Sequence, residues 1–161
     1  MERESDMKRK RVWKAAAVAA ACLLAAAVFG NPLVIWNNHR LRQAVLAVEG
    51  DSVSFNELVP FKWDAVYTFD PYTSKRDIEA ELGFRSGSIR ETVSEGMVQL
   101  IFVRGRSVVC SVCGYSGSLG YRIDFATGLG PAQKLLFSDD AAFAVSREDA
   151  IVQLSLQQRP G

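Results

Sequence analysis

Two of the three cysteines in the chain stand three residues apart, in the sequence Cys110-Ser-Val-Cys113. Such a pair can form a redox centre, supply half of a metal site, or pack as two small side chains. A redox pair needs a thiolate, which a helix N-terminus stabilises, but both residues lie in a β-branched run typical of a strand. A zinc site would need a second pair of ligands, which the sequence lacks. We therefore predict no metal and no cofactor here.

The strand that holds this pair sends its two thiols in different directions. Residues an odd number of positions apart point to opposite faces of a regular strand, so Cys110 is expected on one face with Val108 and Val112. Cys113 falls on the other face, with Ser107 and Val109, next to a glycine-containing loop. We predict a buried thiol at Cys110 and a second one near the end of the strand. A disulfide between them would need a bulge, or an end to the strand before Cys113, and it stays open as an alternative.

Other side chains give no catalytic constellation. His39 is the only histidine, and it lies directly after a long apolar segment, where a general base is badly placed. Several serines are present, but a serine nucleophile needs a base beside it. We therefore predict that the protein is not an enzyme. A thiol redox protein using Cys110 and Cys113 is kept as the alternative function.

The N-terminal part of the chain has a distinctive charge pattern. The first fourteen residues hold six basic and three acidic side chains, within a net charge of +1 for the whole chain. The remainder is slightly acidic, which argues against a nucleic-acid-binding domain. Residues 15–36 are free of charge, and as a helix they would reach roughly 33 Å, enough to cross a bilayer core. We predict a transmembrane helix in contact with the lipid bilayer, with residues 1–14 as a cytoplasmic tail.

A cleaved signal peptide is the main alternative for the same segment. Ala25 with Ala27, or Val28 with Gly30, are small residues at spacings suited to a signal peptidase. Cys22 raises a lipid anchor as a further alternative, although the three residues before it are alanines and lack the large aliphatic residue that such a processing site usually has. Each of these interpretations exports the remainder of the chain.

The remainder is expected to form a connector, residues 37–51, and one α+β domain, residues 52–158. Period-two alternation predicts a half-buried strand over residues 63–70. Its dry side would hold Trp63, Ala65, Tyr67 and Phe69, and its solvent-facing side Asp64, Thr68 and Asp70. Ser74, Asp77 and Gly83 predict the start and end of a helix over 74–82. Three further strands are expected as a meander; they cover residues 97–103, 107–113 and 121–126. Near the C-terminus, a hairpin or a helix is expected. The predicted fold is a mainly antiparallel sheet of five or six strands with one principal helix.

Residues 61–83 carry a resemblance to a group of known proteins. The stretch resembles an F-x-W-D-x-V-Y-x-F-x-P-Y-T-S strand-turn-helix pattern of small, uncharacterised bacterial proteins that are exported or membrane-tethered. The matching residues are Phe61, Trp63, Asp64, Val66, Tyr67, Phe69, Pro71, Tyr72, Thr73, Ser74, Ile78, Leu82 and Gly83. The resemblance implies export and the strand-to-helix unit, and it supplies no catalytic residue.

The function expected from these observations is binding. We predict a non-enzymatic, membrane-tethered extracytoplasmic module that binds another envelope protein or a ligand, with no nucleic-acid partner. Its location would be the bacterial inner membrane, single-pass with the N-terminus inside, or secreted if the segment is cleaved. The candidate partner-binding residues are Trp63, Asp64, Tyr72 and Tyr115, because exposed aromatic residues often anchor partners and a carboxylate can bind a ligand. The alternative places Trp63 in the core and makes Asp64 a hydrogen-bond acceptor near the start of its strand.

Overall fold

The computed structural model describes residues 12–14, 17–18, 31–125 and 132–157. The chain divides into two units, residues 1–32 and 33–161, which are described separately. In the first unit, residues 12–14 and 17–18 are helical. All strands of the described residues belong to the second unit.

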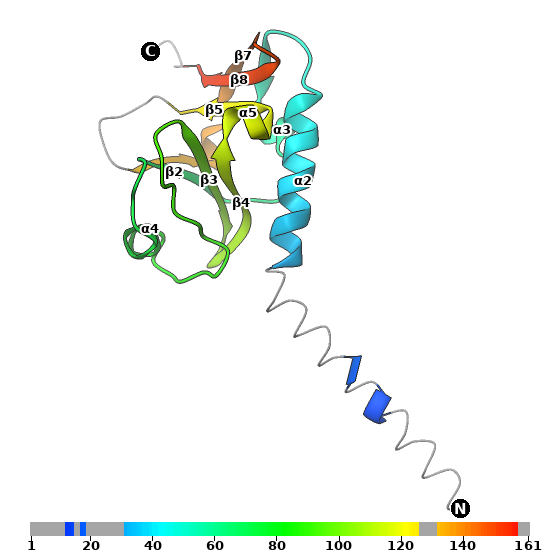
Figure 1. The fold of residues 1–161 in the computed structure, drawn as a ribbon. Coiled ribbons are helices and arrows are strands. Elements are labelled where there is room, and N and C mark those ends of the chain that lie inside the picture. Colours follow the sequence, from blue (N-terminus) through cyan, green and yellow to red (C-terminus); the bar gives the residue numbers. More distant parts are fainter. Residues whose placement is uncertain (1–11, 15–16, 19–30, 126–131, 158–161) are drawn as a thin grey trace, which may run out of the picture. The chain divides into compact units, whose positions relative to one another are not determined.

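Two four-stranded sheets form the second unit (Figure 1). Sheet 1 has the order β1-β7-β8-β5, with bounds Ser52–Ser54, Ala142–Glu148, Ile151–Leu156 and Tyr121–Asp124. Sheet 2 has the order β4-β3-β2-β6, with bounds Ser107–Tyr115, Met97–Arg104, Ala65–Phe69 and Ala132–Leu136. All neighbours are antiparallel except β5 and β8, which run parallel.

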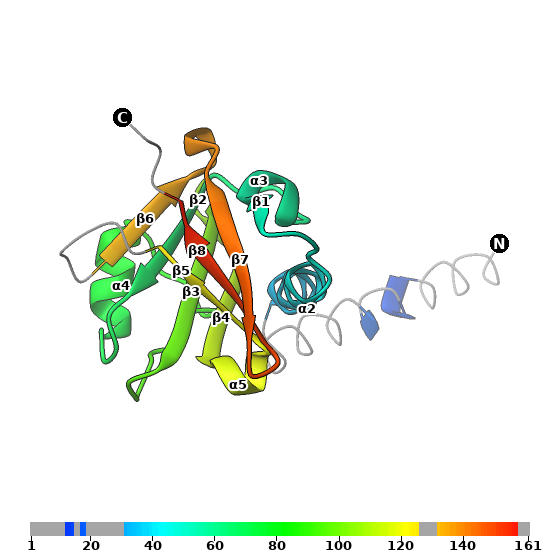
Figure 2. The same cartoon turned by 90° about the horizontal axis from the view of Figure 1, so that it is seen from above.

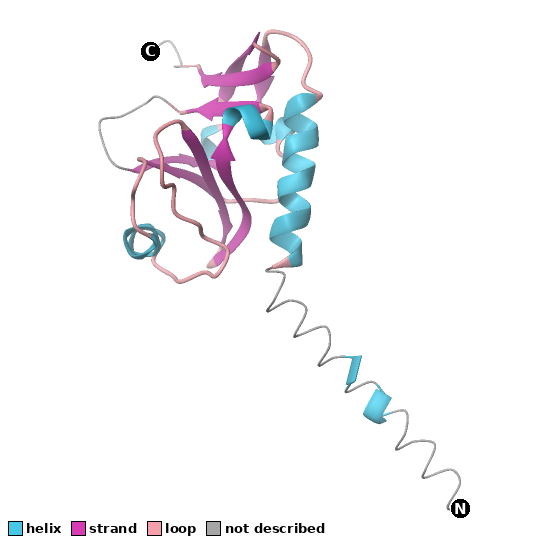
Figure 3. Cartoon of the chain, in the orientation of Figure 1, coloured by secondary structure: helices cyan, strands magenta, loops and turns pink. Residues whose placement is uncertain are grey.

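The helices are few and lie beside or over the sheets (Figure 3). They are α2 (Pro32–Leu46), α3 (Phe55–Leu58), α4 (Lys75–Leu82), α5 (Ser116–Leu119) and the 3-10 turn η1 (Phe137–Asp139). The predicted helix over 74–82 is confirmed as α4. Its cap is Ser74, whose Oγ accepts a hydrogen bond from the Asp77 N–H at 3.2 Å. Gly83 ends it with a φ of 74°, which glycine adopts without steric cost.

The main core lies between the two sheets. Phe55 is its centre: its ring is 4.7 Å from Phe143 of sheet 1 and 6.0 Å from Phe102 of sheet 2, measured between centroids. A second apolar cluster covers the other face of sheet 2, where Ile78 of α4 packs with residues such as Tyr67. Sheet 2 is therefore buried on both faces. The prediction of a half-buried strand over 63–70 is wrong for this reason, since Val66 is fully buried on the face expected to be wet.

The predicted single sheet is also wrong, because the α+β fold has two sheets of four strands each. The meander ends at β4: the next strand, β5, enters sheet 1 and pairs in parallel with β8. The strands β1 and β6 were not expected at all. The C-terminal hairpin is confirmed by β7 and β8, which pair antiparallel from Phe143↔Leu156 to Glu148↔Ile151.

The predicted transmembrane segment is contradicted as well. Within the described ranges, no helix is long and apolar enough to span a membrane, which overturns the single-pass inner-membrane location. Of the predicted segment, residues 15, 16 and 19–30 lie outside the described residues. Its last five residues, from Pro32 to Trp36, instead begin α2. That helix buries Val34, Leu41 and Val45 in the domain.

Candidate functional site

The β4 edge of sheet 2 is closed by α2, which runs beside it (Figure 1). Two neighbouring asparagines of the helix hydrogen-bond to the outer backbone groups of the strand. Asn37 Nδ2 donates to the Val109 carbonyl at 2.8 Å. Asn38 Nδ2 donates to the Ser111 carbonyl at 2.7 Å, and Asn38 Oδ1 accepts from the Ser111 N–H at 2.9 Å. The helix thus replaces the hydrogen bonds that a further strand would make.

The cysteine pair lies on this same strand, and both thiols are free. Cys110 is fully buried, as predicted, and its Sγ donates to Asn38 Oδ1 at 3.0 Å. A bulge between the Phe102↔Cys110 and Val103↔Val108 pairs inserts one extra residue. That insertion moves Val109 to the face of Cys110 and leaves Val108 on the opposite face, so the predicted neighbours of Cys110 were partly wrong.

The thiols have an environment that disfavours thiolate formation. Burial raises the pKa of Cys110 well above its usual range, and burial also raises the pKa of Cys113, against a lowering effect from the nearby Arg90 guanidinium. Redox exchange depends on the thiolate, so a raised pKa slows it. The buried environment of these thiols therefore gives no support to the redox alternative.

Two of the predicted partner-binding residues have structural roles. Trp63 is only 4% exposed and packs edge-on against Phe102, with 5.8 Å between ring centroids. Asp64 accepts a hydrogen bond from the Gly105 N–H at 2.7 Å through its carboxylate, which closes the turn between β3 and β4. Trp63 is therefore not accessible to a partner, whereas Asp64 is exposed and has a structural role in this turn.

The other two predicted residues are exposed but are not brought together with them. Tyr72 is 63% exposed and has a φ of 67°, unusual for a residue with a side chain. It follows β2, whereas Trp63 and Asp64 precede that strand. Tyr115, 50% exposed, ends β4, which is separated from β2 by β3. The four predicted residues thus do not form one site.

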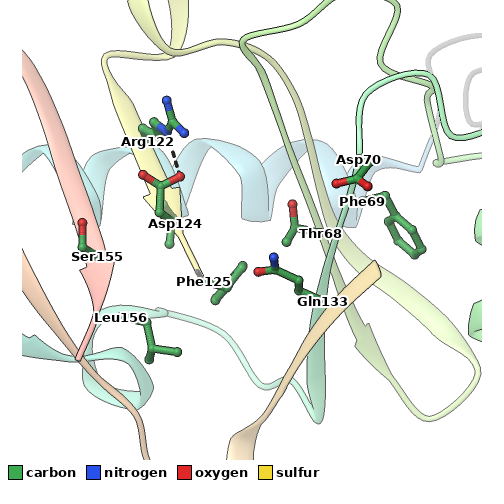
Figure 4. Close-up of a pocket in the computed structure, with 10 residues that line it drawn as sticks. Thr68, Phe69, Asp70, Arg122, Asp124, Phe125, Gln133, Ser155 and Leu156 are labelled. Atoms are coloured by element: carbon green, nitrogen blue, oxygen red, sulfur yellow. Dashed lines mark hydrogen bonds and ion pairs between the residues drawn. The ribbon is translucent and has the colours of Figure 1, made fainter. Parts of the chain in front are cut away.

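A pocket of about 450 Å³ opens between the two sheets, at the end of β2 and β6 (Figure 4). We call it the mouth pocket; its lining residues are Thr68, Phe69, Asp70, Arg122, Ile123, Asp124, Phe125, Gln133, Ser155 and Leu156. Thr68 and Gln133 are register partners on β2 and β6 and lie together on one side. Arg122, Asp124 and Ser155 come from β5 and β8 on the other side (Figure 4).

Only some of the polar side chains that line the mouth pocket are paired with other side chains. Arg122 Nε donates to Asp124 Oδ1 at 2.7 Å, and Gln153 Nε2 donates to Asp124 Oδ2 at 3.3 Å. Within the described part of the chain, the side chains of Thr68, Gln133 and Ser155 make no hydrogen bond. These groups can donate to and accept from a bound molecule.

A second pocket, of about 490 Å³, lies at the same end of β6 and next to α4. We call it the tyrosine pocket; it is lined by Phe69, Pro71, Tyr72, Thr73, Ser74, Asp77, Glu81 and Ala132. Ala132 and Phe69 contact the apolar cluster beneath α4, so this pocket belongs to the outer face of sheet 2. Its charged groups are the two exposed carboxylates, Asp77 and Glu81. Of the predicted site residues, only Tyr72 lines either pocket.

The residues of the mouth pocket were missed by sequence reasoning. Thr68 was assigned to a solvent-facing side of its strand, and Gln133 belongs to β6, which was not expected. A signal was nevertheless present: Gln133 lies two residues before the apolar Leu135, on the same face of the strand, and Leu135 packs in the main core. A polar residue in line with core positions can mark the point where a core opens to solvent.

Metal-binding side chains are not clustered in the described residues. No group of three or more histidine, cysteine, aspartate or glutamate side chains there could hold a metal ion. His39 is exposed on α2, with its ring 6.5 Å from that of Trp36, far along the sequence from both pockets. What the pockets offer is hydrogen bonding and negative charge.

Comparisons with known proteins place the chain in no family. No protein-family model matches it, and neither a curated protein nor a solved structure does. The resemblance over residues 61–83 to small exported bacterial proteins therefore stays a prediction.

Proposed function

We propose that this protein is a non-enzymatic binding module that holds a ligand or a segment of another protein in the mouth pocket. The observation that carries the proposal is the group of hydrogen-bonding side chains, Thr68, Gln133 and Ser155, that make no hydrogen bond to the described chain. They surround an open pocket rather than being buried against one another.

The physical support comes from the position of Thr68 and Gln133 in their strands. One step along the same face, Val66 and Leu135 are buried in the main core. An apolar pair at positions 68 and 133 would extend that core, whereas the polar pair leaves its end hydrated and able to exchange water for ligand groups. Binding sites commonly combine an apolar base with a few polar groups, and Phe125 and Leu156 supply apolar surface here.

The test uses the full chain with a library of small uncharged compounds that carry amide and hydroxyl groups. We expect weak binders whose addition shifts the backbone amide NMR signals of Thr68, Gln133 and Ser155. Thr68→Val keeps the shape of the side chain and removes one hydroxyl, so it should weaken binding by about 2- to 10-fold.

The matched control is Ser146→Ala, which removes an exposed hydroxyl from β7 outside both pockets. It should leave binding unchanged. Binders that shift signals elsewhere, or that bind Thr68→Val as tightly as the unaltered chain, would contradict the proposal.

A further inference from the structure

Strand β6 forms the outer edge of sheet 2, with β2 on its inner side (Figure 2). The Phe137 N–H donates to the Asp64 carbonyl at 2.9 Å, which fixes the alternation of hydrogen bonds along this antiparallel pair. Gln133 and Leu135 therefore direct their backbone groups toward β2. Ala132, Lys134 and Leu136 direct theirs outward.

The outward-facing backbone groups of β6 differ between the two ends of the strand. The Leu136 N–H donates to Asp139 Oδ2 at 2.7 Å, so the end next to η1 is capped by a side chain. Beyond Ala132 and Lys134, the described part of the chain places no further strand. The Lys134 ammonium lies 5.3 Å from the centroid of the Tyr67 ring, which holds its charge against the face of the sheet.

The two pockets lie on opposite faces of the sheet beside this open edge. Gln133 lines the mouth pocket and Ala132 lines the tyrosine pocket, and both pockets share Phe69 of β2. Side chains of a strand alternate between the two faces of its sheet. A strand added outside β6 would therefore place successive side chains over the two pockets in turn.

The charges that line these pockets favour a basic occupant. Four carboxylates and one guanidinium line the two pockets together; they are Asp70, Asp124, Asp77, Glu81 and Arg122. The Arg122 guanidinium is already paired with Asp124 at 2.7 Å. Three carboxylates remain without a cationic partner among the lining residues, one in the mouth pocket and two in the tyrosine pocket.

We propose that the open edge of β6 binds an extended, basic segment of a partner protein as an added β-strand. The backbone of the segment hydrogen-bonds to Ala132 and Lys134, and its alternate side chains enter the mouth pocket and the tyrosine pocket. Lysine or arginine side chains of the segment reach Asp77 and Glu81 on one face. This inference rests on the proposed binding function and names its ligand, in a known mode of peptide recognition.

The experiment uses the full chain to select binders from a displayed library of random peptides about nine residues long. We expect selected peptides to carry lysine or arginine at alternate positions. Lys134→Pro removes the outward N–H without removing a hydrogen bond to β2. The affinity for a selected synthetic peptide should therefore fall by about tenfold or more. Lys134→Ala keeps that N–H and should change affinity by less than about twofold.

A second measurement leaves the protein unaltered, which keeps the test valid if Lys134→Pro fails to fold. Methylation of the peptide's backbone nitrogens one at a time should weaken binding at every second residue and leave the others nearly unaffected. The Glu81→Gln variant should lower the preference for basic over neutral peptides, while Glu57→Gln, an exposed change in α3, should not.

The inference is overturned if no peptide is selected above background, or if Lys134→Pro and the methylated peptides bind as the originals do. A failure of this kind is distinct from failure of the proposed function. Small compounds that depend on the Thr68 hydroxyl would still bind the mouth pocket if only the strand pairing were wrong.

Discussion

The two edges of sheet 2 are finished in different ways. At β4, the helix α2 supplies amide side chains, Asn37 and Asn38, that bond to the outer backbone of Val109 and Ser111. At β6, only Leu136 is capped, by Asp139, and the backbone groups of Ala132 and Lys134 face outward with no described strand beyond them. One sheet thus has a closed edge and an open edge.

This difference makes the β6 edge the better candidate for binding a partner. An exposed edge strand invites pairing with another chain, and proteins usually block it with a helix, a bulge or charges. The β4 edge has two of these devices, since the bulge near Val109 adds to the helix. The β6 edge lacks the helix and the bulge, and its one charged residue, Lys134, places its ammonium over the Tyr67 ring. Two pockets flank this edge, which favours a selective role in binding.

The largest expected effect comes from loosening the helix that closes β4. Leu41 of α2 is fully buried in the main core, so Leu41→Ala should lower the free energy of unfolding by about 3 kcal/mol. Gln43→Ala, an exposed change on the same helix, should stay within about 0.5 kcal/mol. Urea denaturation followed by tryptophan fluorescence measures both. Equal effects of the two variants would show that α2 is not held as described.

A smaller effect is expected from removing the amide that satisfies the strand edge. Asn38→Ala leaves the Ser111 N–H and carbonyl without their partner and should cost about 2 kcal/mol. The neighbouring exposed His39 provides the control, and His39→Ala should change stability by less than about 0.5 kcal/mol. If Asn38→Ala were neutral, water would satisfy this edge as well as the helix does, and the contrast between the edges would disappear.

The buried thiol of the closed edge predicts a loss of stability in alkali. The pKa of Cys110 is raised by burial, so above about pH 8.5 the unfolded thiol loses its proton while the folded one keeps it. The unfolded state is then favoured, and the free energy of unfolding should fall by about 1 to 2 kcal/mol between pH 8 and pH 10.

The variant that tests this assignment is Cys110→Ala. Its lower starting stability should decline less steeply over the same pH range, because the titrating thiol has been removed. The less buried Cys113 supplies the comparison, and Cys113→Ala should keep most of the alkaline slope. An unchanged slope in Cys110→Ala would mean that another group causes the loss, such as Tyr121, whose pKa is also raised by burial.

The smallest effect on stability is expected at the open edge. Because the Lys134 N–H faces away from β2, Lys134→Pro should change the free energy of unfolding by no more than about 1 kcal/mol. Leu135→Pro, one residue along, removes an N–H that faces β2 and a buried side chain, and it should destabilise far more. A large loss of stability in Lys134→Pro, measured by thermal unfolding, would show that this N–H makes a hydrogen bond within the protein.

Parts of the fold were predictable because their signals are local. The helix α4 follows from Ser74 and Gly83, which cap it within a few residues of its ends. The hairpin of β3 and β4 follows from two apolar runs joined through Gly105, which has a φ of 57°. Each of these elements is decided by neighbours in the sequence, and each formed as expected.

The rest depends on contacts between distant residues. Alternation of apolar and polar residues is the same whether a strand joins one sheet or another, so nothing local places Tyr121–Asp124 beside β8. The start of α2 was obscured because Val34 is apolar both as a membrane residue and as a core residue. The pockets combine β2, β5, β6, β8 and α4, and only Tyr72 among the predicted site residues reaches one of them.

Amide hydrogen exchange at two residues tests the contrast between the edges most directly. The Ser111 amide, bonded to Asn38, should exchange slowly in the free protein and in the presence of a selected basic peptide. The Lys134 amide should exchange quickly in the free protein and slow by about tenfold or more when the peptide is bound to saturation. A Lys134 amide that is already protected without peptide, or that is unchanged at saturation, would contradict an open, binding edge at β6.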